Sequence, residues 1–196
     1  SVFFTDSTTG YVGGSVTFPT GAILKTTNGG STWNQQTIPT TQYVQRMFFI
    51  SRDTGFTACT RGILKTTNGG TTWIQKYTGT DQYNSLSFPD HRTGFASSVN
   101  GYVMKTTDGG ESWSRSASAI QSLSTELFFV SPLTGYLVAS FGAIFKTTDG
   151  GATWSQQVSG TSQNLQSVFF TSATTGYAVG WYGTILKTTT GGSTTS

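Results

Sequence analysis

The sequence predicts an all-β fold, a five-bladed β-propeller. Three observations point to it: a repeated turn motif, short strands between turns, and a composition rich in glycine and aromatic residues. The chain has 196 residues with 25 glycines, 14% aromatic residues and only 10% charged residues. A unit of about 40 residues that forms one four-stranded sheet cannot bury both of its faces alone, so such sheets stack around an axis. We therefore expect a single propeller domain over residues 1–196, with blades at about 1–40, 41–80, 81–120, 121–162 and 163–196.

The strongest signal is a nine-residue string that recurs along the chain. Residues 25–33 read Lys-Thr-Thr-Asn-Gly-Gly-Ser-Thr-Trp, and close copies span 65–73, 105–113 and 146–154. The Asn or Asp of each copy can accept hydrogen bonds from backbone N–H groups two or three residues on, and the two glycines supply positive φ. We expect each Trp to pack across its hairpin against the next blade. The residues in these structural roles are Asn28, Trp33, Asn68, Trp73, Asp108, Trp113, Asp149 and Trp154.

An aromatic segment precedes each copy of this string. The first unit has Val2-Phe3-Phe4 followed by Gly10-Tyr11, and the same pattern returns four more times. Each unit therefore predicts four short strands, named A to D here: an aromatic strand, a Gly-Tyr/Phe strand, a Leu-Lys-Thr strand and the strand that follows the Trp. Turn residues about ten positions apart separate them, as is typical of all-β folds. Helices are not expected, because no window has a sustained apolar period of 3.6 residues.

The fifth unit departs from the repeat in its turn string. Thr190 stands where the other copies have Asn or Asp, and Thr195 stands where they have Trp. We therefore expect the last blade to lack a regular outer strand. An unpaired edge strand offers open N–H and C=O groups, so we expect residues ahead of Ser1 or the tail itself to fill this edge. The alternative is self-assembly of the chain through its incomplete fifth blade.

The string Thr-Thr-[Asn/Asp]-Gly-Gly-x-[Ser/Thr]-Trp resembles the Asp-box, also called the bacterial neuraminidase repeat (BNR). With its Gly-Tyr strand, the whole unit is similar to the repeats of photosystem II assembly and stability factors and, more distantly, to sortilin and sialidase propellers. The resemblance covers nearly the entire chain. It implies a propeller whose boxes face away from the usual binding surface. It also implies a second hypothesis for function, an assembly factor that grips a segment of a membrane protein.

The order of the strands predicts which loops lie opposite the boxes. In an up-and-down blade the A–B and C–D turns share one face, so the B–C and D–A loops form the other, where function commonly resides. Aromatic residues expected there, suited to stacking on sugars or gripping a protein, are Trp181, Tyr182, Phe18, Phe141, Tyr43 and Tyr83. Charged residues expected there are Arg46, Arg61, Asp81 and Glu126. The alternative is that several of these aromatic side chains fill space between blades.

Catalysis has little support in the sequence. Sialidases, which the boxes resemble, use three arginines and a Tyr/Glu pair, but Arg52 and Arg92 belong to A–B turns on the box face. A glycosidase needs two carboxylates about 5–10 Å apart, and only Asp81 and Glu126 are left on the candidate face. We therefore expect no enzyme. A glycoside hydrolase that uses these two acids is the weaker alternative.

Cysteine content and charge argue against several kinds of site and partner. Cys59 is the only cysteine, so we expect no internal disulfide and no zinc site of the cysteine-cluster type. His91, the only histidine, has no neighbours in the sequence that suggest a metal site, and no nucleotide-binding pattern is present, so we also expect no metal and no cofactor. The net charge of +3 comes mostly from a lysine at one position of the repeat, which spreads it around the ring and argues against a nucleic-acid partner. Membrane insertion is not expected, because no apolar run reaches about 18 residues.

The sequence thus predicts a non-catalytic binding or assembly module for a protein or a glycan. Its surface, rich in Thr, Ser, Asn and Gln and poor in Lys and Glu, is more typical of secreted bacterial repeat proteins than of cytosolic ones. We expect a secreted, periplasmic or cell-surface location, or a lumenal one if the photosystem resemblance holds. Ser1 leads directly into an apolar strand without a basic leader, as expected of a mature chain after signal cleavage or of part of a longer chain.

Overall fold

The computed structural model describes residues 1–17, 20–39, 42–116, 120 and 122–192. Its strands form five antiparallel sheets with neighbouring strands in chain order, four sheets of four strands and a last sheet of three. The described residues contain no α-helix, only two single 3₁₀ turns, η1 (Ser140–Gly142) and η2 (Trp181–Gly183). None of the helices in this part of the chain is long and apolar enough to cross a membrane. The all-β prediction is confirmed.

Each sheet is one blade, and its strands follow the order A to D. The first blade contains β1 (Val2–Phe4), β2 (Gly10–Thr17), β3 (Thr20–Thr26) and β4 (Asn34–Gln36). The second contains β5 (Val44–Phe49), β6 (Gly55–Cys59), β7 (Gly62–Thr66) and β8 (Ile74–Thr78). The third contains β9 (Tyr83–Ser87), β10 (Gly94–Ser98), β11 (Val103–Thr106) and β12 (Ser114–Arg115). The fourth contains β13 (Ser124–Phe129), β14 (Gly135–Ala139), β15 (Ile144–Thr147) and β16 (Ser155–Gln157), and the fifth contains β17 (Leu165–Phe170), β18 (Gly176–Gly180) and β19 (Ile185–Thr188).

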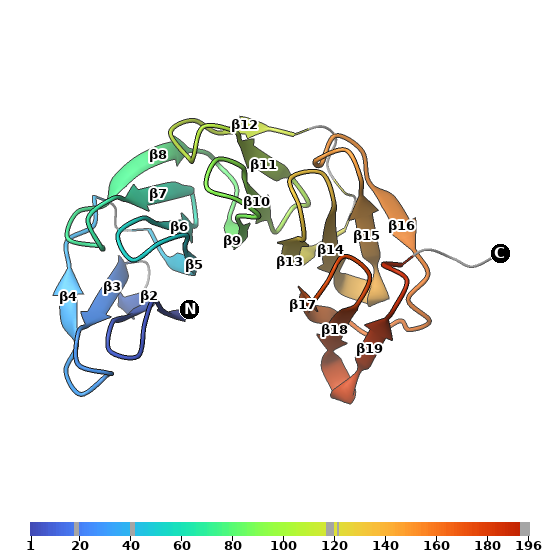
Figure 1. Cartoon of the computed structure of the whole chain (residues 1–196), viewed down its shortest axis with the longest axis horizontal. Helices are drawn as coiled ribbons and strands as arrows, with labels where there is room; N and C mark the ends of the chain where they lie inside the picture. Colours follow the sequence, from blue (N-terminus) through green and yellow to red (C-terminus); the bar gives the residue numbers. More distant parts are fainter. Residues whose placement is uncertain (18–19, 40–41, 117–119, 121, 193–196) are drawn as a thin grey trace.

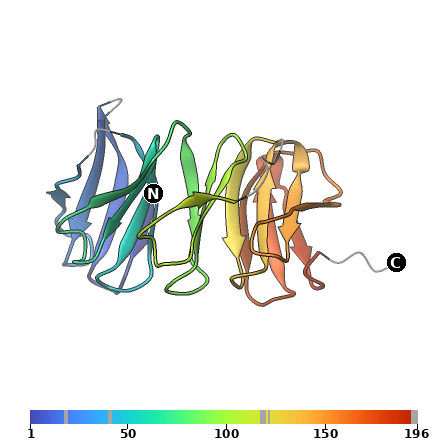
Figure 2. The same cartoon turned by 90° about the horizontal axis from the view of Figure 1, so that it is seen from above.

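The five blades stand side by side in an open arc (Figure 1). Strand A of each blade lies on the inner side of the arc, and the D strands β4, β8, β12 and β16 lie on the outer side. The first and last blades form the two ends of the arc and do not adjoin each other. Seen from above, the strands run between two faces that carry the turns (Figure 2). Each interior blade therefore packs against two neighbours, and each end blade packs against one.

A glycine and an aromatic residue at the start of strand B create the main contact between blades. A Cβ on Gly55 would lie 2.5 Å from the Phe49 ring, so only glycine lets that ring lie flat on strand B. The next residue, Phe56, stacks on Phe88 of the following blade with ring centroids 4.2 Å apart. The same stacked pair recurs at the other joints as Tyr11–Phe49 at 4.2 Å, Phe95–Phe129 at 3.4 Å and Tyr136–Phe170 at 3.9 Å.

A lysine on strand C forms a second contact with the next blade. Lys65 Nζ donates to the carbonyl of Gly109, the first glycine of the following box, at 2.7 Å. The equivalent bonds are Lys25 to Gly69 at 2.6 Å, Lys105 to Gly150 at 3.1 Å and Lys146 to Gly191 at 2.6 Å. The hydroxyls of Tyr11 and Tyr136 donate to the same carbonyls of Gly69 and Gly191, at 2.8 and 2.9 Å. The repeated lysine is therefore a structural link between blades.

The box turns are closed by their own side chains. Thr32 donates its backbone N–H to Asn28 Oδ1 at 2.9 Å, and Gly30 donates its N–H to Thr26 Oγ1 at 2.9 Å. Equivalent bonds reach from Thr72 to Asn68, from Ser112 to Asp108 and from Thr153 to Asp149. The main bond therefore reaches the fourth residue, one further than expected, because the positive φ of the two glycines curls the chain around the side chain.

The box tryptophans pack differently from the expectation. Trp73 meets Phe49 of its own blade edge-on, with centroids 6.0 Å apart and planes at 84°. Trp113 meets Phe88 in the same way and also approaches Phe56 of the preceding blade, at 6.5 Å. The prediction that each Trp packs against the next blade is wrong, since the ring turns back onto its own strand A.

The fifth blade lacks an outer strand in the described residues, as predicted. Ser1 does not fill that edge, because it lies in the first blade and donates its N-terminal nitrogen to the Gly13 carbonyl at 2.9 Å. The tail, residues 193–196, lies outside the described residues.

Candidate binding surface

Hydrogen bonds between turns define two faces of the molecule. The first glycine of each box donates its N–H to a carbonyl of the A–B turn in the same blade, as from Gly69 to Asp53 at 2.9 Å and from Gly109 to Arg92 at 2.8 Å. On the opposite side, B–C loops bond to D–A loops, as from Ser140 N to Leu123 O at 3.1 Å. The loops with the candidate aromatic residues thus lie opposite the boxes.

Three exposed aromatic side chains gather on this face in the B–C loops of the fourth and fifth blades. Phe141 in η1 is 80% exposed, and Trp181 and Tyr182 in η2 are 52% and 88% exposed. The rings of Trp181 and Tyr182 lie edge to face with centroids 6.4 Å apart. Asn164 ties the two loops together, because its Oδ1 accepts from Phe141 N at 2.8 Å and its carbonyl accepts from Trp181 N at 2.9 Å. We call the two turns that carry these three residues, η1 and η2, the aromatic loops.

The backbone of the aromatic loops is strained. Phe141 and Tyr182 have φ of 58° and 55°, and they are the described non-glycine residues with positive φ. Each precedes a glycine that also has positive φ, an arrangement in which Asn-Gly is the usual pair. A bulky residue in this region costs about 1–2 kcal/mol. Because the rings gain no burial in exchange, the strain indicates a role outside the core.

Tyr83 does not lie on this face. It is the first residue of strand A in the third blade and is fully buried, edge-on against Tyr77 of the second blade at 5.7 Å. Its placement among the binding residues is wrong, because its side chain turns into the joint between two blades. Tyr43 is half-buried and Arg61 is exposed. Phe18 lies outside the described residues.

Glu126 and Arg46 belong to inner strands, which corrects their placement in loops. Buried Glu126 of β13 forms an ion pair with Arg46 of β5. Its other oxygen accepts a hydrogen bond from the Ser167 hydroxyl and one from Val168 N at 3.0 Å. One carboxylate thus joins the second, fourth and fifth blades along the inner side of the arc.

Asp81 is also buried, and all its described partners lie in the third blade. It accepts a hydrogen bond from Asn100 Nδ2 at 3.0 Å and pairs with Arg115 Nη2 at 3.4 Å. Arg115 in turn lies over the Tyr102 ring, 3.5 Å from its centroid. Asp81 and Glu126 therefore have separate partners, and each is paired with an arginine of its own. Within the described ranges, no group of three or more His, Cys, Asp or Glu side chains could hold a metal ion.

The family model of the photosynthesis system II assembly factor YCF48 matches residues 27–168, which is most of the chain. The chain belongs to this family. The predicted resemblance to Asp-box repeats, and to the repeats of photosystem II assembly factors, is thereby confirmed. The comparison with curated protein sequences finds no match.

Solved structures of similar fold include two structures of YCF48. YCF48 from Cyanidioschyzon merolae is 18% identical with a TM-score of 0.69, over 92% of this chain and 63% of that one. A structure of YCF48 bound to D1 peptide is 17% identical with a TM-score of 0.53, over 96% of this chain and 92% of that one. The GH74 enzyme of Niastella koreensis is 17% identical with a TM-score of 0.79, over 99% of this chain and 37% of that one. At these identities the likeness shows the propeller fold alone. The chain spans less than two thirds of the Cyanidioschyzon YCF48 and of the GH74 enzyme.

Proposed function

We propose that this chain is a non-catalytic, protein-binding propeller of the assembly-factor kind, and that the aromatic loops grip an extended segment of its partner. The observation that carries the proposal is the pair of strained loops that hold Phe141, Trp181 and Tyr182 in solvent. Membership of the YCF48 family supports it, as does the YCF48 structure in which a D1 peptide is bound.

The aromatic loops suit protein recognition on physical grounds. Trp and Tyr carry much of the energy at protein interfaces because they offer large, rigid area at a low cost in side-chain entropy. Asn164 already fixes both loops through hydrogen bonds, so little backbone ordering remains to oppose binding. The engaged carboxylates of Asp81 and Glu126 support the non-catalytic part of the proposal, because each is committed to an arginine.

Titration of the D1 peptide by calorimetry tests this function. Wild type should bind, and Trp181→Ala and Tyr182→Ala should each weaken the affinity by about tenfold or more. Arg92→Ala, an exposed residue in an A–B turn on the box face, serves as the control and should bind like wild type. Unchanged affinity in both aromatic variants would refute the assignment of the site. Binding of a sugar on a glycan array, lost in Trp181→Ala, would point to a glycan in place of a protein.

We also propose that the chain works outside the cytosol, in a lumenal, periplasmic or extracellular compartment. The low Lys and Glu content supports this location, as does the family description as a photosynthesis system II assembly factor. Fractionation of source cells with an antibody against the chain tests it, and recovery only with cytosolic markers would contradict it.

A further inference from the structure

The two aromatic loops belong to different blades. Phe141 lies in η1 of the fourth blade, and Trp181 and Tyr182 lie in η2 of the fifth. A partner that contacts both loops needs them at a fixed distance from each other, because a binding site works only when its groups are held in place. That distance depends on how the fifth blade is held against the fourth.

Both loops are anchored at the start of the inner strand of the fifth blade. Asn164, the residue before β17, accepts a hydrogen bond from Phe141 N through its side chain at 2.8 Å and one from Trp181 N through its carbonyl at 2.9 Å. A shift of β17 relative to β13 of the fourth blade would therefore carry Asn164 and η2 away from η1. The contacts between β13 and β17 decide whether the two loops keep their spacing.

Two consecutive residues of β13 hold β17 in place. Thr125 Oγ1 donates to the Leu165 carbonyl, the residue next to Asn164, at 2.7 Å. One carboxylate oxygen of Glu126 accepts from the Ser167 hydroxyl and from Val168 N, the latter at 3.0 Å. Because β13 and β17 belong to different sheets, their backbones form no ladder with each other. Side-chain bonds such as these therefore set how the two strands are aligned.

Glu126 makes a stronger link than the residues at its position in other blades. Ser85 occupies this position in the third blade, and its hydroxyl accepts from Leu127 N of the fourth at 3.1 Å. Such a serine binds one neighbouring blade only. Glu126 has a second oxygen, which forms the ion pair with Arg46 of the second blade. Hydrogen bonds to a charged group are also about twice as strong as bonds between neutral groups.

Burial makes this link rigid. Glu126 is only 7% exposed, so its carboxylate depends on protein groups for its hydrogen bonds. A buried charge that loses a partner has little water to replace it, so a displacement of either neighbouring blade is strongly opposed. The carboxylate therefore restrains the second and fifth blades together, each through one of its two oxygens.

We propose that Glu126 is a positioning residue for the aromatic loops. By holding β17 against β13 it fixes the distance between η1 and η2, and it does so without touching the partner. Its effect on affinity rests on the proposed function of the loops, whereas its effect on their distance does not. Loops that are already in place lose less freedom on binding, so loosening this link should weaken binding.

Spin labels on the two loops measure their distance without any ligand. Phe141→Cys and Tyr182→Cys provide the labelling positions, since both side chains are exposed, while fully buried Cys59 should stay unlabelled. Pulsed electron paramagnetic resonance should give a narrow distance distribution in this protein. Adding Glu126→Ala should widen or shift the distribution. Adding Glu126→Gln, which keeps an acceptor for Val168 N but loses the ion pair, should have a smaller effect.

The matched control is Ser85→Ala, which removes the equivalent bond between the third and fourth blades. It should leave the distance between the labels unchanged, because β13 still holds β17. A distribution in Glu126→Ala and Glu126→Gln as narrow as in the starting protein would overturn the proposal. Equal widening in Ser85→Ala would overturn it as well, since the effect would then be one of general loosening.

Titration of the unlabelled proteins with the D1 peptide by calorimetry tests the effect on binding. Glu126→Ala should weaken the affinity by about three- to tenfold, and Ser85→Ala should bind like wild type. Wild-type affinity in Glu126→Ala would refute the role of Glu126 in binding. If wild type itself does not bind the peptide, the proposed function fails, and the distances between the labels still decide whether Glu126 positions the loops.

Discussion

Cys59 illustrates how burial in a blade changes the reactivity of a side chain. It lies fully buried in β6, and burial raises the pKa of its thiol to about 12. Because the thiolate is the reactive form, a thiol reagent at pH near 8 should leave the folded protein unmodified. One equivalent should react when denaturant unfolds the chain. Rapid stoichiometric modification in native buffer, followed by absorbance, would show that the second blade opens.

The box aspartates predict the response to acid. The Ser112 hydroxyl and backbone N–H hold the pKa of Asp108 well below its usual range, and the Thr153 hydroxyl and N–H lower that of Asp149 to about 2. Since the folded-state pKa is below the unfolded value, the ionised form favours folding. This contribution is complete above the unfolded pKa, about 4, and disappears as the pH falls through the folded pKa.

The first two boxes supply the comparison for that prediction. Asn28 and Asn68 make the same backbone bonds without a charge. The double variant Asp108→Asn, Asp149→Asn should therefore lose less Tm between pH 5 and pH 2 than wild type, as thermal melts would measure. Asn28→Asp should lose more. Parallel Tm curves for all three proteins would contradict this account.

At single residues the sequence was informative about turns and less so about side-chain direction. The box residues could be predicted because each turn is a local structure of a few consecutive residues. Glu126 was misplaced because strand A begins at Ser124, two residues before it, and a small shift of a strand boundary moves a side chain from a loop to the inner side of the arc. Its partners Arg46 and Ser167 are far away in sequence, so local patterns contain no sign of them.

At the scale of the element, a comparison of the equivalent residues Tyr136 and Tyr177 gives the contribution of one contact between blades to the free energy of unfolding. Tyr136 is buried, stacks on Phe170 and donates to the Gly191 carbonyl, whereas Tyr177 of the last blade is 37% exposed and has no described stacking partner. Tyr136→Ala should lower the free energy of unfolding by about 3–5 kcal/mol, the usual cost of removing a buried aromatic ring. Tyr177→Ala should lower it by less than about 1 kcal/mol. Urea unfolding checks both, and equal losses would mean that another blade covers the fifth.

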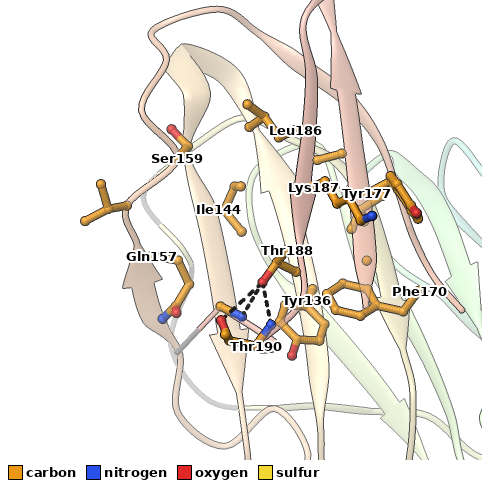
Figure 3. Close-up of a pocket in the computed structure, with 15 residues that line it drawn as sticks. Tyr136, Ile144, Gln157, Ser159, Phe170, Tyr177, Leu186, Lys187, Thr188 and Thr190 are labelled. Atoms are coloured by element: carbon orange, nitrogen blue, oxygen red, sulfur yellow. Dashed lines mark hydrogen bonds between the residues drawn. The ribbon is translucent and has the colours of Figure 1, made fainter. Parts of the chain in front are cut away.

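The four-stranded unit was predictable because its turn residues and its strand segments recur at the same spacing in successive units. The five-bladed fold is confirmed, and in the described part of the chain the last blade has three strands, as expected. The strained 3₁₀ turns at Phe141 and Tyr182 were not predictable, because both aromatic residues violate the preference for Asn at that position. The cavity between the fourth and fifth blades (Figure 3) was not predictable either, since residues of two blades together form it.

For the whole molecule, stability should fall toward the ends of the arc. In a repeat array each unit depends on its own strands and on its contacts with neighbours, so a unit with one neighbour opens more easily. Within the described residues, the fifth blade has one neighbour and three strands, while the second, third and fourth blades each have two neighbours and four strands. Hydrogen exchange followed by mass spectrometry should show β17–β19 losing protection first. Uniform exchange across all five blades would contradict this prediction.

The lysine links between blades also give the molecule a direction. At every joint the lysine comes from the earlier blade and the carbonyl from the later one, so the described arc ends with an unmatched ammonium at Lys187 and begins with an unmatched carbonyl at Gly29. Blades linked in this way can follow one another in one orientation only. Because all four joints use the same two groups, one further copy of the repeat would meet its neighbour through the same lysine-to-carbonyl bond.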